Sequence, residues 1–218
     1  MAFQDLVQAA QKYFPSLQIQ YKDQSSFMKF LGFLLFFNKS FMADYTTTVG
    51  NTVYLPSANY VKLHPVSGSV VFLHELVHLH DHKRVGSVWF HFSYLAPQIF
   101  VIPALLLFLL SWKIALPITI FFLLPLPSYF RMIYERRAYY ASMYCLKKLG
   151  DSMNFDPQLS QQASYFAEYF IDSSYYFMWP FSSIIDDDFT AAAQLVAEGK
   201  RPYEDPVFDI LDDLITKI

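Results

Sequence analysis

The stretch FLHELVHLHDHKR, residues 72 to 84, holds four of the chain's six histidines and one glutamate. His74, Glu75 and His78 follow the pattern His-Glu-x-x-His. On a helix, residues four apart lie one above the other, so both imidazoles can reach a single metal ion. Glu75 is offset around the helix, where its carboxylate can take a proton from a metal-bound water as a general base. The pattern predicts a zinc site rather than a pair of structural histidines, because two unpaired imidazoles among apolar neighbours would be costly.

Zinc of this kind needs a third protein ligand. Glu135 opens a helical pattern directly after a long apolar tract, and a hairpin in that tract would return the chain beside the helix that carries the histidines. Glu168, which lies on another amphipathic pattern, is the competing ligand. A first-turn salt bridge of Glu135 with Arg131 or Arg136 is the structural alternative. We expect Glu135 to complete the zinc site.

The residues that follow the motif offer further polar contacts. Asp81 and His82 lie about one turn beyond His78, and we expect them to hydrogen-bond around the site or to face solvent. A fourth ligand from either residue would close the zinc to water and indicate a non-catalytic, zinc-stabilised membrane scaffold or sensor. A catalytic site also needs a donor for the developing oxyanion. The candidates for that donor are Tyr139, Tyr140, Tyr175, Tyr176 and Arg201.

The composition limits the classes of partner. Of the 218 residues, 54% are hydrophobic and only 16% are charged, a balance typical of a protein that hides surface in lipid or in a partner. The net charge of -3, without a basic block, argues against nucleic acid as a partner. Cys145 is the only cysteine, so an internal disulfide is excluded and a packing role is expected. The length suits one domain over residues 1–218.

An apolar tract separates the motif from its expected third ligand. Two runs without a charged side chain, of sixteen and seventeen residues at 95–110 and 114–130, are joined through Lys113. Each approaches the roughly 17–25 residues of a spanning helix, and prolines interrupt both. We expect a hairpin over 92–130 that enters the membrane; the alternatives are a hairpin buried in the protein's own core or docked on a partner. By the positive-inside rule, the zinc site faces the cytoplasm, because the basic residues flanking the hairpin on that side are Lys83, Arg84, Arg131, Arg136 and Arg137.

The remaining patterns indicate a mostly α protein with a small β-hairpin or edge strand. The β-branched segment 45–57 has Gly50-Asn51 as its turn signal. The motif helix is expected to begin near Ser67 or Ser69, either of which could cap it. The other helices are expected at 3–14, at 27–37, from Phe130 to a C-cap at Gly150, near 158–172 and over 203–218.

The order of these parts resembles the membrane zinc proteases of the CAAX prenyl protease and bacterial heat-shock protease family. Those proteins carry His-Glu-x-x-His on a helix, then a transmembrane hairpin, then a helix with Glu-x-x-Ala-Asp that supplies the third ligand. The matching pieces here are HELVH at 74–78, the apolar hairpin and ERRAY at 135–139, with Tyr139 in place of the family's aspartate. The resemblance implies a zincin-like fold of the gluzincin type, zinc as the cofactor, and hydrolysis of a peptide or protein substrate. It also implies that the strand within 45–57 binds an extended substrate.

Overall fold

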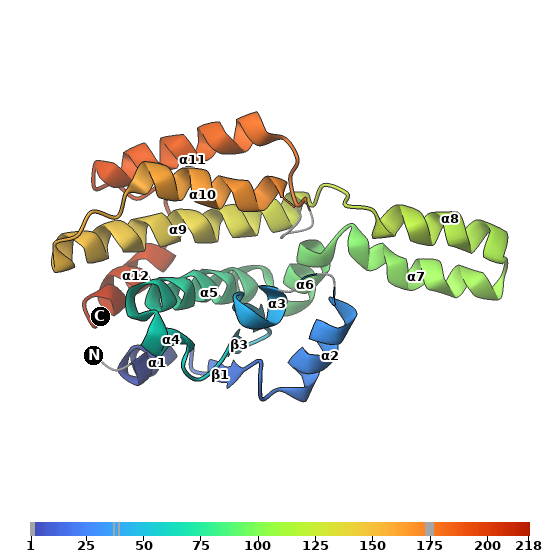
Figure 1. Cartoon of the computed structure of the whole chain (residues 1–218), viewed down its shortest axis with the longest axis horizontal. Coiled ribbons are helices and arrows are strands. Elements are labelled where there is room, and N and C mark those ends of the chain that lie inside the picture. The colour runs from blue at the N-terminus through green and yellow to red at the C-terminus, as the bar shows by residue number, and fades with distance from the viewer. Residues whose placement is uncertain (1–2, 37, 39, 173–176) are drawn as a thin grey trace.

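Two long helices run side by side through the centre of the molecule (Figure 1). They are α5 (Pro65–Val85), which carries the histidine motif, and α9 (Tyr129–Met153), which carries the predicted third ligand. The computed structural model describes residues 3–36, 38, 40–172 and 177–218. Within these ranges the protein is mostly helical with one small sheet, as the sequence predicts.

Further helices enclose this central pair (Figure 1). α10 (Leu159–Ile171) and α11 (Ser182–Ala197) pack on each other and on the side of α9 away from α5. α12 (Val207–Ile215) contacts both central helices, and α1 (Phe3–Tyr13) packs against α12. The helices predicted near both ends of the chain and near 158–172 are therefore confirmed.

A three-stranded sheet lies beside α5, with β3 (Thr52–Leu55) in the middle. β2 (Thr47–Val49) pairs with it antiparallel, and β1 (Gln18–Tyr21) pairs with it parallel. The turn between β2 and β3 contains Gly50, whose φ of 60° is a conformation that suits glycine. The predicted hairpin is confirmed, and β2 forms the edge of the described sheet that contacts α5.

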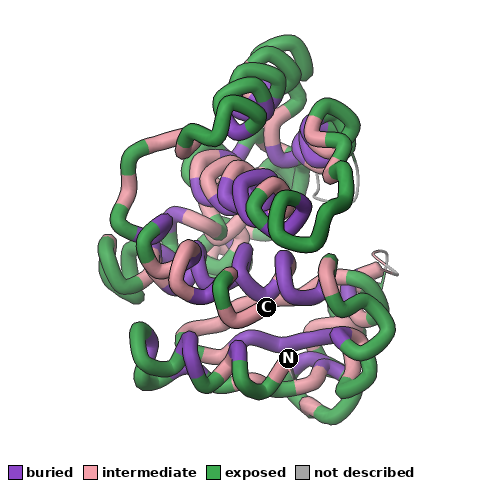
Figure 2. Tube along the Cα trace, turned by 90° about the vertical axis from the view of Figure 1, so that its left-hand side faces the viewer, coloured by how far each residue is buried: buried purple, intermediate pink, exposed green. Residues whose placement is uncertain are grey.

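Two apolar clusters meet at α9. One lies between the sheet, α1, α5, α9 and α12, and includes the fully buried side chains of Phe72 and Phe208. Cys145 belongs to this cluster, which confirms its packing role. The other cluster joins α9 to α10 and α11 around Phe170 and Phe189. Figure 2 shows the buried stretches on the inner ribbons, and α9 is fixed from two sides by them.

The motif helix begins earlier than the sequence predicts. α5 starts at Pro65, two residues before Ser67, so the start lies near the predicted one, but the cap residue is His64 and the prediction of a serine cap is wrong. Proline suits the first helical position because its φ is already helical and the backbone N–H it lacks would have no partner there. The Ser69 hydroxyl donates to the Pro65 carbonyl at 2.7 Å within the first turn, and it does not cap the helix.

The third-ligand helix runs past its predicted end. Gly150 lies inside α9, and the C-cap is Asn154 with a left-handed φ of 57°. Glycine is needed at 150 for another reason, because an added Cβ would lie 2.7 Å from the Phe155 carbonyl oxygen. The prediction of Gly150 as the C-cap is therefore wrong, and the residue instead permits the chain to fold back closely on the helix.

The apolar tract forms a hairpin that projects from the body of the molecule (Figure 1). After α6 (Ser87–Leu95), its outward arm consists of 3-10 turns at Gln98–Phe100 and Leu107–Leu109 around α7 (Val101–Leu106), and α8 (Trp112–Leu123) returns. Among the described helices, none is by itself long and apolar enough to cross a bilayer. Ser87–Leu95 together with Gln98–Leu109 meets the length and composition, with a bend of 89° between them.

Three short helices complete the described fold. α2 (Ser26–Leu34) and α3 (Ser40–Ala43) connect β1 to β2, and α4 (Tyr60–Leu63) leads into α5. α2 accounts for the helix predicted at 27–37 and is shorter than predicted. Its buried Met28 forms a small cluster with Phe41 and Tyr54, which fastens this connection to the sheet.

Candidate metal centre

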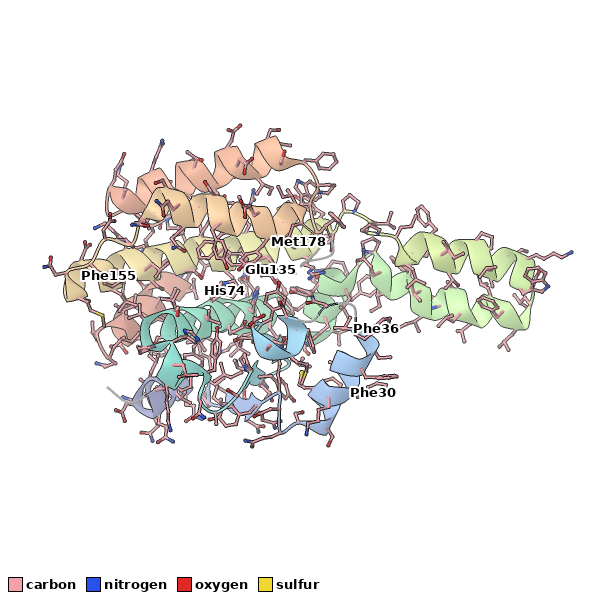
Figure 3. The ribbon with its side chains drawn as sticks, viewed as in Figure 1. Phe30, Phe36, His74, Glu135, Phe155 and Met178 are labelled. Atoms are coloured by element: carbon pink, nitrogen blue, oxygen red, sulfur yellow. The ribbon has the colours of Figure 1, made fainter. Side chains whose placement is uncertain are left out.

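Three side chains from α5 and α9 converge on one point. Figure 3 shows His74 and Glu135 near each other where the two helices run side by side. The Nε2 atoms of His74 and His78 lie 3.2 Å apart, and Glu135 Oε2 lies 3.5 Å from the first and 3.6 Å from the second. All three residues are buried. The hairpin thus returns the chain beside the motif, and the predicted ligand set is brought together.

The size of this triangle fits a metal ion. Ligand atoms held at about 2.0–2.1 Å by a tetrahedral ion lie about 3.3 Å from one another. The three measured separations scatter around that value. Glu135 Oε2 is also buried without a hydrogen-bond partner, although it faces two imidazole nitrogens. An anionic oxygen of this kind is stable in the interior only with positive charge beside it, so the residues present fit a bound cation.

A serine on α9 fixes the ring of His74. The Ser142 hydroxyl donates to the Ala138 carbonyl at 3.0 Å and lies 3.2 Å from His74 Nδ1. Because its one proton is already given to the carbonyl, the hydroxyl must accept the Nδ1 proton of His74. That tautomer leaves the lone pair of Nε2 directed into the centre, as a metal ligand requires.

A tyrosine on α6 fixes the carboxylate. The Tyr94 hydroxyl donates to Glu135 Oε1, which leaves Oε2 for the two histidines. Neither Arg131 nor Arg136 makes a salt bridge to Glu135: Arg136 pairs with Asp188, and the Arg131 guanidinium stacks over the Tyr94 ring. The structural alternative for Glu135 is therefore not what the structure shows.

The electrostatics of the centre favour a cation. Burial alone raises the pKa of the Glu135 carboxyl, but His78 and His74 more than offset this and hold it well below its usual range. Burial likewise lowers the pKa of His78, whereas the carboxylates of Glu135, Glu75 and Asp81 raise it to a net value of about 9. Glu135 is therefore an anion at neutral pH, and the position between it and the histidines attracts either a proton or a metal ion.

Glu75 lies next to the ligands on the side of the sheet. Its Oε2 accepts a hydrogen bond from the Thr48 hydroxyl at 2.6 Å, so the edge strand β2 orients the carboxylate. Glu75 is buried and does not belong to the ligand triangle. Its place beside the ligands, and not among them, suits the base that the motif predicts.

The polar residues after the motif have partners away from the centre. Asp81 accepts two bonds from Arg137 and one from Arg84, so it acts on His78 only through its charge. His82 packs its ring against Phe90 and His91 instead of turning toward the ligands. Neither residue joins the ligand group within the part of the chain that the structure describes.

The predicted oxyanion donors are scattered. Tyr139 packs edge-on against His74, with ring centres 4.6 Å apart, and stays near the centre. Tyr140 packs on Phe189 in the second cluster, and Arg201 pairs with Asp209 and Asp212. Tyr175 and Tyr176 lie outside the described residues. The competing ligand Glu168 is exposed on α10 and is not brought to the histidines.

Sequence reasoning missed three supporting residues: Thr48, Tyr94 and Ser142. Thr48 lies in a predicted strand, and Tyr94 lies near the start of the apolar tract, so neither pattern indicated a contact with the motif. Ser142 is one helical turn beyond Tyr139, the position of the family's aspartate. A search for a polar residue one turn further along α9 would have found it.

Comparison with known proteins adds no relative. No family model, curated protein or solved structure matches this chain. The interpretation of the centre rests on its own geometry.

Proposed function

We propose that this protein is a zinc-dependent endopeptidase with a zincin-like fold of the gluzincin type. The observation that carries the proposal is the buried triangle of His74, His78 and Glu135, with the separate carboxylate of Glu75 beside it. Two imidazoles and one carboxylate are the ligand set of many hydrolytic zinc sites. The edge strand β2, which holds Glu75 through Thr48, supplies a backbone edge beside the centre where an extended peptide can pair.

Each supporting residue has a role in hydrolysis. Zinc held by the three ligands would supply the acidity that makes water a nucleophile near neutral pH. Glu75 takes a proton from that water, with Thr48 holding Oε2 and leaving Oε1 free for the transfer. As the water oxygen bonds to the peptide carbon and the C–N bond breaks, Glu75 returns the proton to the leaving nitrogen. Tyr139, whose ring packs edge-on against His74, is the candidate donor for the developing oxyanion.

The number of ligands favours catalysis over a scaffold. A structural zinc site is closed by four protein ligands, whereas a catalytic one keeps a position for water. Asp81 and His82, the predicted closing ligands, are engaged elsewhere. Three ligands within the described chain therefore support the peptidase rather than the zinc-stabilised scaffold or sensor.

Membrane association is part of the same proposal. The projecting hairpin exposes large apolar side chains on successive positions of both arms, which water would not favour. Basic residues flank its root, and we propose that the metal centre faces the cytoplasm. The proposed substrate is a peptide or protein that reaches the centre from that side.

The deciding experiment separates metal binding from chemistry. Glu75→Gln should bind about one equivalent of zinc like the wild type and lose peptide cleavage by at least about a hundredfold, because only the base is removed. Zinc content and the new termini formed in a protein substrate measure the two effects. Glu135→Gln should lose zinc and activity together, whereas Glu168→Gln, the exposed control, should lose neither.

Two results would contradict the proposal. Equal cleavage by wild type and Glu75→Gln would assign the activity to another protein in the preparation. Zinc bound at full occupancy by four side chains, with no cleavage of any protein or peptide tested, would establish the scaffold.

A further inference from the structure

α2 carries large apolar side chains on most of its circumference, but only one apolar face is covered. Its inner face packs Met28, Leu31 and the following Leu35 against Phe41 and Tyr54. The other face consists of large apolar side chains that are about half exposed or more: Phe27, Phe30, Phe33 and Leu34, with Phe36 just beyond the helix. Large apolar side chains gathered on a helix face normally lie inside a protein or in lipid. The outer face of α2 is therefore largely uncovered, although its side chains would be more stable in an apolar environment.

This exposed face is firmly positioned. Lys22, at the end of β1, is fully buried and donates to the Phe41 carbonyl at 2.6 Å. Its ammonium also lies 4.0 Å from the centre of the Phe41 ring. Together with the packing of Met28, these contacts hold the α2–α3 connection on the sheet. The phenylalanines on the outer face of α2 are therefore exposed even though the helix itself is packed against the sheet.

α2 and the hairpin lie toward one end of the molecule, and the termini lie toward the other (Figure 1). Figure 3 shows Phe30 and Phe36 on the side of α2 nearer the hairpin. The root of the hairpin is itself rich in exposed aromatic side chains, namely Trp89, Phe92, Phe100, Tyr129 and Phe130. Tryptophan and tyrosine gather at the level of lipid headgroups, and Trp89 and Tyr129 fit this pattern.

We propose that α2 is an interfacial helix that lies in the headgroup layer of the same phospholipid bilayer that the hairpin enters. A lipid surface fits better than a protein partner because the apolar face of α2 lies toward the same end of the molecule as a hairpin that is exposed on several sides. Leu105 and Leu106 on one arm, and Ile120 and Phe121 on the other, are exposed at adjacent positions, so their side chains point in different directions. Lipid covers all of these directions, whereas a protein interface covers one.

Lys29 supports the choice of lipid. It is the one charged residue of α2 and is exposed among the phenylalanines. A lysine there can keep its stem along the apolar face and its ammonium among anionic headgroups. Two contacts, α2 and the hairpin, would fix the orientation of the body, which the hairpin alone leaves free to tilt. The peptidase would then work with its metal centre at a set distance from the membrane surface.

Vesicle flotation tests the proposal on the full-length protein. With vesicles of phosphatidylcholine and phosphatidylglycerol, Phe30→Ser/Phe33→Ser should lower the bound fraction at least about tenfold relative to the wild type, because binding scales with the apolar area that enters the interface. Phe155→Ser is the matched control. Phe155 is also exposed, at 37%, but lies at the opposite end of the molecule. The Phe155→Ser variant should bind vesicles to the same extent as the wild type. The measurement needs no metal, so it is independent of the proposed peptidase activity.

A second variant guards against loss of folding. In a background in which Trp89, Trp112 and Trp179 are replaced by Phe, Phe33→Trp keeps the apolar face, and its emission should be quenched by lipids brominated near the headgroup. Tryptophan introduced at Phe155 should not be quenched. Wild-type vesicle binding by Phe30→Ser/Phe33→Ser, alongside lost binding by Ile102→Ser/Leu106→Ser in the hairpin, would overturn the proposal. So would α2 variants that change only the self-association of the protein, because the occupant would then be a second copy of the chain.

Discussion

At the scale of single residues, the buried carboxylate of Glu135 dominates the centre. It lies against two imidazole nitrogens that are themselves only 3.2 Å apart. Two lone pairs and an anion cannot share a low-dielectric pocket without a positive charge between them. Without a metal, a proton on His78 supplies that charge, which is why its pKa rises to about 9. Metal and proton therefore compete for the same position.

This competition predicts a pH dependence of metal affinity. His78 is protonated below pH about 9, and its Nε2 must lose that proton before it can bind a metal. Glu135, whose pKa lies well below its usual range, stays ionised and contributes no further proton. From pH 6 to 8 the zinc affinity should therefore rise about tenfold per pH unit, with release of about one proton. Calorimetric titration in buffers of different ionisation enthalpy counts the protons; an affinity independent of pH would contradict the prediction.

The hydrogen bond between Ser142 and His74 predicts that substitution of Ser142 weakens metal binding, although His74 itself is retained. Ser142→Ala removes the acceptor that holds the Nδ1 proton, so Nε2 is no longer fixed as the lone-pair nitrogen. Such supporting contacts are typically worth about 10- to 100-fold in metal affinity. Ser152→Ala is the control, because Ser152 donates to the Leu149 carbonyl on the same helix in a similar way. Equal zinc affinity in both variants would show that Ser142 does not set the tautomer.

The part of the site that the sequence predicts is the part set by local geometry. His74, Glu75 and His78 belong to one helix, so their spacing alone places them. Glu135 required the added assumption that the apolar tract turns back, and the structure confirms it. Thr48, Tyr94 and Ser142 reach the centre only through tertiary packing, which no spacing in the sequence encodes.

At the scale of elements, a buried ion cluster ties α5 to α9 and to the segment before α12. The Arg137 guanidinium bonds both oxygens of Asp81 and one oxygen of Asp205. Burial lowers the pKa of Arg137, and the two carboxylates more than reverse this, so the net shift is upward. Asp81 lies one turn from His78, and Arg137 lies two residues after Glu135. The cluster therefore holds together the two helices that carry the ligands.

Removal of this cluster should destabilise the whole fold. Arg137→Ala leaves Asp81 fully buried and Asp205 nearly so, without their shared cation, and should lower the free energy of unfolding by about 3 kcal/mol. Arg136→Ala is the matched control on the adjacent position. Its partner Asp188 is 37% exposed, so the cost should be at most about 1 kcal/mol. Urea unfolding measures both, and equal values would show that the cluster does not clamp the helices.

A helix or strand was predictable from the sequence where the residues of that segment alone determine its structure. The hairpin at β2–β3 follows from its β-branched residues and a glycine turn, and the helices follow from their apolar spacing. β1 was missed because four residues, QIQY, form a strand only through parallel pairing with β3, about thirty residues away. α5 begins at Pro65, and α9 ends at the cap residue Asn154. Ser67 and Gly150 are more typical cap residues, so the sequence favoured them instead.

At the scale of the whole molecule, the length of the hairpin determines how it meets the bilayer. α8 has 12 residues, so the arm is about 18 Å long against a hydrocarbon core of about 30 Å. The tip carries Trp112 and Lys113, which suit headgroups. A lysine left at the bilayer centre costs about 2.5–3.5 kcal/mol or more. The extended Lys113 side chain makes up part of the difference in length, so the bilayer has to thin only by the remainder, at fractions of a kcal/mol per Å. We therefore expect the tip to reach the far headgroups through local thinning and the extended Lys113 side chain.

Cysteine labelling in intact cells tests this orientation. In a Cys145→Ala background, which removes the buried native thiol, Ser111→Cys should react with an impermeant thiol reagent from outside the cell. Ser164→Cys, on the exposed side of α10, should react only after lysis, because the proposed orientation, based on five basic residues at the root of the hairpin, has the body in the cytoplasm. Reaction of Ser111→Cys only after detergent is added would mean that the hairpin enters the bilayer and stops short of the far surface. Its reaction in lysed cells without detergent would mean that the hairpin lies outside the membrane altogether, and the proposed membrane association would then be wrong.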